Sequence, residues 1–84
     1  MDFFDVYILT RLVIEENGNV TAENMDVTFD IHEAEAHREK GIENDFEKFS
    51  VPADWRGDAE TSNLVKAMRE FREMVRQWQE EALR

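Results

Sequence analysis

The side chains in this chain that could do chemistry are mostly carboxylates, and they gather in the middle of the sequence. Eight of them fall between residues 26 and 47: Asp26, Asp30, Glu33, Glu35, Glu39, Glu43, Asp45 and Glu47. Alternate residues of a β-strand lie about 6.6 Å apart on one side of it, which is close to the phosphate spacing of a nucleic-acid backbone. On a strand, Glu43, Asp45 and Glu47 would therefore present a row of charges that imitates phosphates.

Negative charge is concentrated in the same region. The 84 residues carry a formal net charge of −10, and residues 15–60, with fourteen acidic and four basic residues, account for all of it. Such a field repels nucleic acid and anionic membranes and attracts basic protein surfaces. Acidic runs also often form a solvated rim that keeps a small protein soluble. Both interpretations of the charge remain open.

The other residues with catalytic or metal-binding potential do not form a recognisable site, because of their spacing or their neighbours in the sequence. His32 and His37 are five residues apart, which places them about 140° apart around a helix, so one ion cannot reach both from that helix. The chain has no cysteine, and neither Ser50 nor Ser62 lies in a glycine-flanked elbow. A glycine-rich phosphate loop is also absent from the sequence. We therefore expect no metal, no cofactor and no enzymatic activity.

The first half of the chain predicts a β-hairpin. Residues 3–15 alternate, and the even positions from Phe4 to Ile14 are almost purely apolar, so we expect them to face the core. Asn17-Gly18 predicts a tight type I′ turn with both residues at positive φ. A second strand over residues 20–29 changes phase near Glu23-Asn24, which predicts a bulge there.

The second half predicts a helix, a strand and a longer helix. Asp30 and Glu33 have capping-box spacing at the start of a helix over residues 31–40, and a strand is expected over 45–51. An amphipathic helix is expected over residues 60–83, with the apolar stripe Leu64, Met68, Phe71, Val75, Trp78 and Ala82. That stripe either covers the sheet or pairs with another copy. Trp55, in the preceding loop, is either a lid on the core or an exposed anchor for a partner.

These elements predict an α+β fold of order ββαβα, as a single domain over residues 1–84. A three-stranded antiparallel sheet packs against the long C-terminal amphipathic helix and one short helix, with the helices expected on one face. The N-terminus has no basic flank typical of a signal peptide, and its apolar run is too short to span a membrane, so we expect a cytoplasmic protein.

A short, cysteine-free, strongly acidic ββαβα chain with a capped helix between Asp30 and Gly41 resembles small phage-encoded inhibitors of host defence. These include anti-CRISPR proteins and other nucleic-acid mimics. The resemblance covers the general architecture and the acidic bias of residues 15–60. It implies an inhibitor in the host bacterial cytoplasm that occupies a basic, nucleic-acid-binding surface of a host protein complex. We expect no direct contact with nucleic acid or membrane.

In that role, the partner-binding residues predicted from the sequence are Asp26, Asp30, Glu33, Glu35, Glu43, Asp45 and Glu47, with Trp55 as an apolar anchor. Two alternatives stay open. One is a small homodimeric assembly protein, joined through the Phe3/Tyr7/Leu9 face or the Trp78 end of the last helix. The other is an acidic, antitoxin-like partner of a basic protein.

Overall fold

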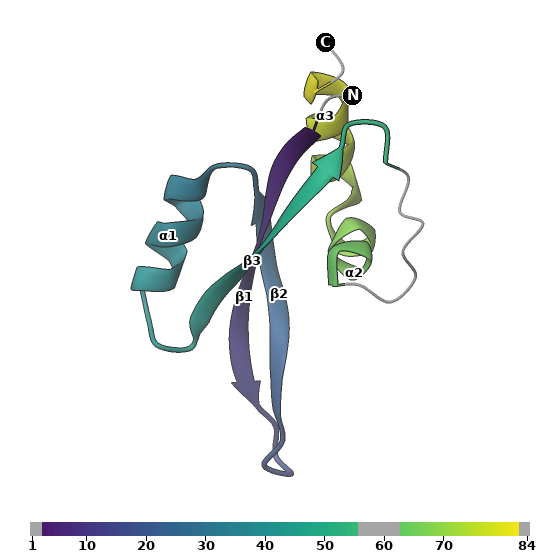
Figure 1. Ribbon diagram of the computed structural model, residues 1–84. Helices are drawn as coiled ribbons and strands as arrows, with labels where there is room; N and C mark the ends of the chain where they lie inside the picture. Colours follow the sequence, from purple (N-terminus) through teal and green to yellow (C-terminus); the bar gives the residue numbers. More distant parts are fainter. Residues whose placement is uncertain (1–2, 56–62, 83–84) are drawn as a thin grey trace.

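The computed structural model describes residues 3–55 and 63–82. Along this part of the chain lie β1 (Phe3–Ile14), β2 (Val20–Thr28), α1 (Ile31–Glu39), β3 (Asn44–Pro52), α2 (Asn63–Glu70) and α3 (Arg72–Ala82), as Figure 1 shows. The strands form one antiparallel sheet in the order β2-β1-β3. The predicted α+β class and element order are confirmed, with the last predicted helix divided in two.

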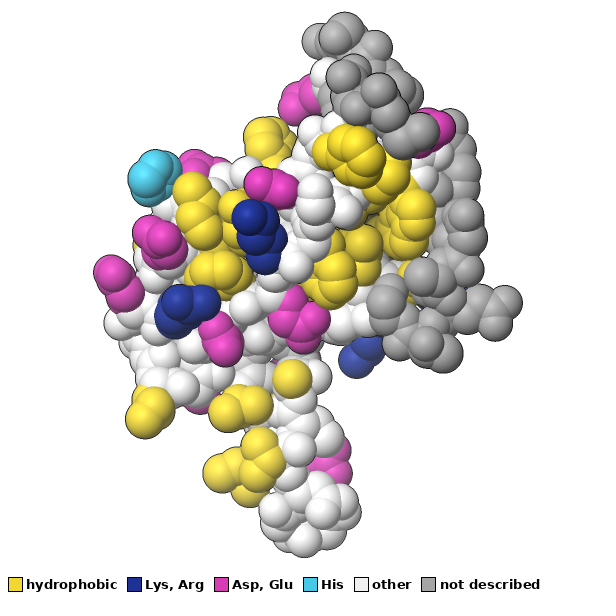
Figure 2. Space-filling view, in the orientation of Figure 1, with side chains coloured by type: hydrophobic (Ala, Val, Ile, Leu, Met, Phe, Trp, Pro, Cys, Tyr) yellow, Lys and Arg dark blue, Asp and Glu magenta, His cyan; other side chains and the backbone are white. Residues whose placement is uncertain are grey.

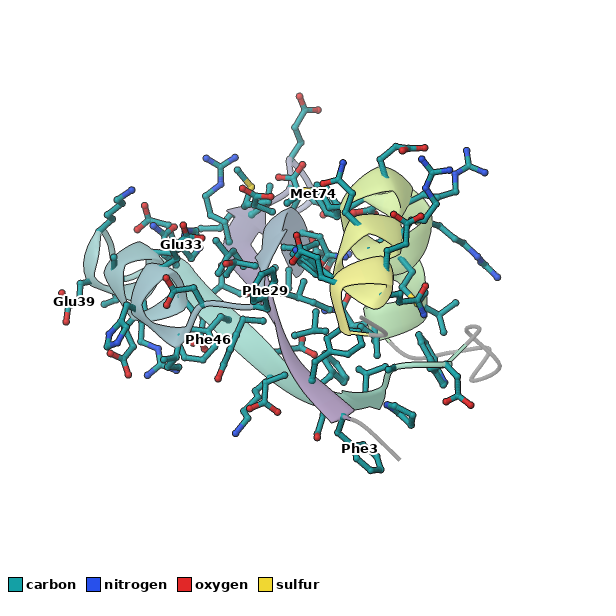
Figure 3. The ribbon with its side chains drawn as sticks, turned by 90° about the horizontal axis from the view of Figure 1, so that it is seen from above. Phe3, Phe29, Glu33, Glu39, Phe46 and Met74 are labelled. Carbon is teal, nitrogen blue, oxygen red and sulfur yellow. The ribbon has the colours of Figure 1, made fainter. Side chains whose placement is uncertain are left out.

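β1 is the central strand because both of its faces are apolar. Val6 and Ile8 point to one face and Tyr7 and Leu9 to the other, and all four are buried. The helices therefore lie on opposite faces of the sheet, α1 on one and α2 with α3 on the other (Figures 1 and 3). The expectation that both helices share a face was wrong, because it gave the odd residues of β1 no cover.

The core has two parts, one on each face. The larger part joins the sheet to α2 and α3 through Val6, Ile8, Val27, Val51, Leu64, Ala67, Val75 and Trp78. The smaller part joins the sheet to α1 through Tyr7, Leu9 and the fully buried Ala34, with Ile31 and Phe46 packed beside them. Tyr7 and Leu9 are thus covered by α1, so they do not form the free dimer face suggested by the sequence.

The hairpin between β1 and β2 has the predicted bulge but a different turn. The register shifts between Leu9 and Thr10, which pair with Asp26 and Asn24 and leave Met25 as the extra residue. Gly18 has φ of 85°, and no other residue in the described ranges has a positive φ. A type I′ turn needs two such residues, so the predicted turn type was wrong. The Glu15 N–H donates to the carbonyl of Asn19 (2.8 Å), which closes a three-residue loop.

The predicted C-terminal helix is interrupted at Phe71, between α2 and α3. The Phe71 N–H still donates to the Ala67 carbonyl (2.8 Å), and the Val75 N–H donates to the Phe71 carbonyl (3.2 Å). Helical hydrogen bonds therefore continue across the break. Phe71 itself packs against the core. Both segments bury apolar residues in the larger core, Leu64 and Ala67 from α2 and Val75 and Trp78 from α3. The predicted start, residues 60–62, and the end, residue 83, lie outside the described residues.

Candidate functional site

Three of the predicted acidic residues meet in a groove where β2 runs into α1 and faces α3. The groove has a volume of about 370 Å³. We call it the acidic groove and define it by its acids Asp26, Asp30 and Glu33 and its apolar residues Phe29, Met74 and Trp78. Figure 3 shows Phe29 at the centre of this region, with Glu33 on the α1 side and Met74 on the α3 side.

The connection between β2 and α1 fixes two of the three carboxylates. Asp30 is the N-cap of α1, and its Oδ1 accepts a hydrogen bond from the His32 N–H (2.9 Å). The Thr28 hydroxyl donates to Glu33 Oε2 (2.6 Å) and accepts from the Asp30 N–H (3.1 Å). The Glu33 carboxylate therefore does not accept a hydrogen bond from the Asp30 N–H, as the predicted capping box requires. The Thr28 hydroxyl accepts that hydrogen bond instead. One hydroxyl holds both acidic residues at the rim of the groove.

The groove also has an aromatic wall. Phe29 stands edge-on to Trp78, with ring centroids 5.4 Å apart and planes at 88°. Trp78 is 8% exposed but Phe29 is 52% exposed, so the Phe29 ring borders solvent. A second hollow of about 210 Å³, lined by Phe4, Phe29, Trp78 and Glu81, adjoins the same ring. Aromatic residues at a rim of carboxylates form a concave surface with apolar and anionic parts side by side.

This arrangement suits a cation on an apolar stem. A Lys or Arg side chain lays its methylenes on apolar surface and keeps its charged end toward oxygen atoms or an aromatic face. Among the residues that the structure describes, no Lys or Arg lines the groove. Within the described ranges, Asp26, Asp30 and Glu33 also form no ion pair, whereas Asp5, Glu23, Asp45 and Glu73 each do. The charges of the acidic groove are therefore not neutralised by this part of the chain itself.

The acidic residues predicted to form a row along β3 do not all lie on that strand. Glu43 lies in the turn before the strand, so only Asp45 and Glu47 alternate on it. Asp45 forms an ion pair with Arg38 (3.1 Å), whose guanidinium also lies 4.1 Å from the centre of the Phe46 ring. Glu47 accepts a hydrogen bond from the Asn63 side chain (3.1 Å). The row on β3 is therefore shorter than predicted, and both of its acidic residues have partners within the protein.

The two remaining predicted site residues lie elsewhere. Glu35 is exposed on α1 and does not line the acidic groove. Trp55 is half-buried and packs against the larger core, and its carbonyl accepts a hydrogen bond from the Gln79 side chain. Trp55 thus occupies the lid position of the two roles considered from the sequence.

Sequence reasoning missed the apolar half of the groove. Trp78 was assigned to the helix stripe and Phe29 to the end of a strand. The available signal was the position of Phe29 immediately before the N-cap Asp30, where a strand residue emerges beside a helix terminus. Which helix would face it depends on tertiary packing, which periodicity does not specify.

The described ranges contain neither a cluster of three or more His, Asp or Glu side chains placed to hold a metal ion nor a helix that is long and apolar enough to cross a membrane. His37 directs its Nε2 to the carbonyl oxygen of Thr10 (2.8 Å), which links α1 to β1. His32 is exposed on α1. The two histidine side chains therefore have different surroundings: His37 contacts β1, and His32 is exposed.

No protein-family model, curated protein or solved structure matches the chain. The geometry and charge of the acidic groove are therefore the basis for the function proposed below.

Proposed function

We propose that this protein is a non-enzymatic acidic binding protein that occupies a basic, nucleic-acid-binding surface of a host protein or complex. Its narrower role is that of a phage-encoded inhibitor of bacterial defence, of the anti-CRISPR kind, acting in the host cytoplasm. Charge and site geometry support the proposed class of partner. The narrower role rests on the resemblance in architecture and acidic bias.

The observation that carries the proposal is the meeting of Asp26, Asp30 and Glu33 in one groove beside the exposed Phe29 ring. A solubilising rim needs charge spread over the surface, and it does not need a concave site or an exposed aromatic ring. Interfaces that bind tightly combine an aromatic contact with charged groups on the rim. The acidic groove supplies both, and the field of the whole chain attracts basic surfaces over a longer range.

Two matched variants separate this site from general acidity. The groove variant, Asp26→Asn/Asp30→Asn/Glu33→Gln, removes three charges, keeps an N-cap at 30 and keeps an acceptor for Thr28. The strand variant, Glu43→Gln/Asp45→Asn/Glu47→Gln, removes the same number of charges from β3 and its turn. Both variants lose three formal charges, so a difference in binding between them does not come from net charge.

The test is parallel affinity capture from bacterial lysate, followed by release with salt and with excess nucleic acid. We expect wild type and the strand variant to retain the same nucleic-acid-binding proteins, and the groove variant to lose at least tenfold of that binding. Added nucleic acid should release them by competition. Equal capture by both variants, or capture that nucleic acid does not reduce, would contradict the proposal. Recovery of one small basic protein that binds no nucleic acid would favour the antitoxin-like alternative.

A further inference from the structure

The β1–β2 hairpin extends beyond the helices as a projecting arm, which we define as residues 11–24 (Figure 1). It contributes to the long axis of a molecule that measures 45 × 28 × 18 Å. The pairs Leu12–Ala22 and Ile14–Val20 stand directly opposite each other, so their four side chains share one face. Leu12, Ile14 and Val20 are 52%, 76% and 58% exposed. Figure 2 shows hydrophobic side chains along this part of the surface.

On the opposite face of the arm, three of the four paired positions are polar. Arg11 pairs with Glu23 there (3.6 Å), and the exposed Thr21 stands opposite the half-buried Val13. A hairpin surrounded by water would be expected to carry polar residues on both faces, since exposed apolar surface gains nothing from folding. The asymmetry between the two faces is the pattern of a sheet that is covered on one side.

The arm also has an unpaired backbone edge. The Glu15 N–H bonds to Asn19, so odd residues of β1 direct their backbone groups toward β2. The backbone N–H and C=O groups of their partners, Thr21 and Glu23, point toward β1. The backbone groups of Val20, Ala22 and Asn24 therefore point away from the sheet, and β2 is an edge strand with no described strand beyond it. Such an edge can pair with another strand.

We infer that a second copy of this chain pairs with the arm, β2 against β2 in antiparallel fashion, around a twofold axis at Ala22. This register places Val20 opposite Asn24 of the second copy and Thr21 opposite Glu23 of the second copy. No like charges then stand directly across from each other. The apolar faces of the two arms join into one, because directly opposite residues lie on the same side of a sheet.

The charge distribution favours this contact between copies. Each chain carries −10, but the pairing segment 20–24 contains a single charged residue, Glu23, which stands opposite Thr21 of the second copy. Antiparallel arms place the two acidic bodies at opposite ends of the pair, so repulsion between them is lower than in a contact between bodies. The remaining repulsion is screened by salt. Self-association should therefore strengthen as salt rises, whereas binding of a basic partner weakens.

The first test is sedimentation equilibrium over a series of salt concentrations. We expect a dimer whose dissociation constant falls with added NaCl, and at least tenfold weaker association for Val20→Lys. Phe3→Lys is the matched control, because Phe3 is 60% exposed on the same hairpin but at the other end of β1. A monomer at high protein and salt concentration, or equal association of both variants, would overturn the inference. Circular dichroism checks that the variants are folded.

The second test fixes the register, and it uses the absence of native cysteine. Residues at a hydrogen-bonded antiparallel pair have Cα atoms about 5.5 Å apart, within the range of a disulfide. Ala22→Cys should therefore crosslink under mild oxidation. Thr21→Cys should crosslink at least tenfold more slowly, because its equivalents lie about 8 Å apart on the other face. Faster crosslinking of Thr21→Cys would contradict the Ala22 axis. Loss of dimerisation in Val20→Lys with capture of basic proteins retained would show that the two surfaces act independently.

Discussion

At the residue scale, the Thr28 hydroxyl connects strand, cap and groove. Thr28 is 7% exposed, and its side chain bonds both Glu33 and the Asp30 N–H. Removing a buried hydroxyl with two partners destabilises a protein by more than the net free energy of the two hydrogen bonds, because the partners are left unsatisfied. Here the partners include two of the three acids of the acidic groove.

Replacing Thr28 with Val keeps the shape of the side chain and removes the hydroxyl. We expect the free energy of unfolding to fall by about 1–2 kcal/mol, measured by urea titration, because a part-buried carboxylate and a backbone N–H lose their partner. Thr21→Val is the control on the exposed arm, where we expect a change within about 0.5 kcal/mol. Equal effects from the two variants would mean that the Thr28 bonds contribute nothing to stability.

At the element scale, α1 has little apolar surface with which to dock. Ala34 is its one fully buried residue among those described, packed against Tyr7 and Leu9. Arg38 adds a contact over Phe46, and the ring of Phe46 stands edge-on to Tyr7 with centroids 5.7 Å apart. The position of α1 sets where Asp30 and Glu33 lie, so its docking also determines the shape of the groove.

Ala34→Leu tests that docking by overfilling it. We expect the free energy of unfolding to fall by about 1–3 kcal/mol, because the added methyl groups have no space between α1 and β1. Ala36→Leu, on the exposed side of the same helix, is the matched control with an expected change within about 0.5 kcal/mol. A loss of stability from Ala36→Leu as large as that from Ala34→Leu would contradict the packing of α1.

Local periodicity was sufficient to predict the elements but not their arrangement. The alternation in residues 3–15 and the capping signal at Asp30 predicted a strand and a helix that the structure contains. The placement of helices on opposite faces depends on the burial of Tyr7 and Leu9. The division at Phe71 falls where the sequence has neither Gly nor Pro to mark it. Likewise, the acids could be named from sequence, but the contact of β2 with α3 decides that Asp26, Asp30 and Glu33 lie beside Trp78. Such long-range packing has no signal in the spacing of residues.

At the scale of the whole molecule, the two proposals use separate surfaces. The proposed basic partner would bind the anionic and aromatic groups of the acidic groove, and the proposed second copy would bind the apolar face of the arm. Salt affects them in opposite directions, because it screens attraction at one surface and repulsion at the other. A dimer would present two grooves and so increase the avidity for a partner with repeated basic sites.

The most direct test of the central claim is an NMR titration of the labelled protein with a short arginine peptide, with an equally long glutamine peptide as control. We expect the largest chemical-shift changes at Asp26, Phe29, Asp30, Glu33 and the Trp78 indole N–H, with loss of those changes in the groove variant and their retention in the strand variant. Shifts spread evenly over the acidic surface, or centred on Asp45 and Glu47, would contradict the acidic groove as the binding site.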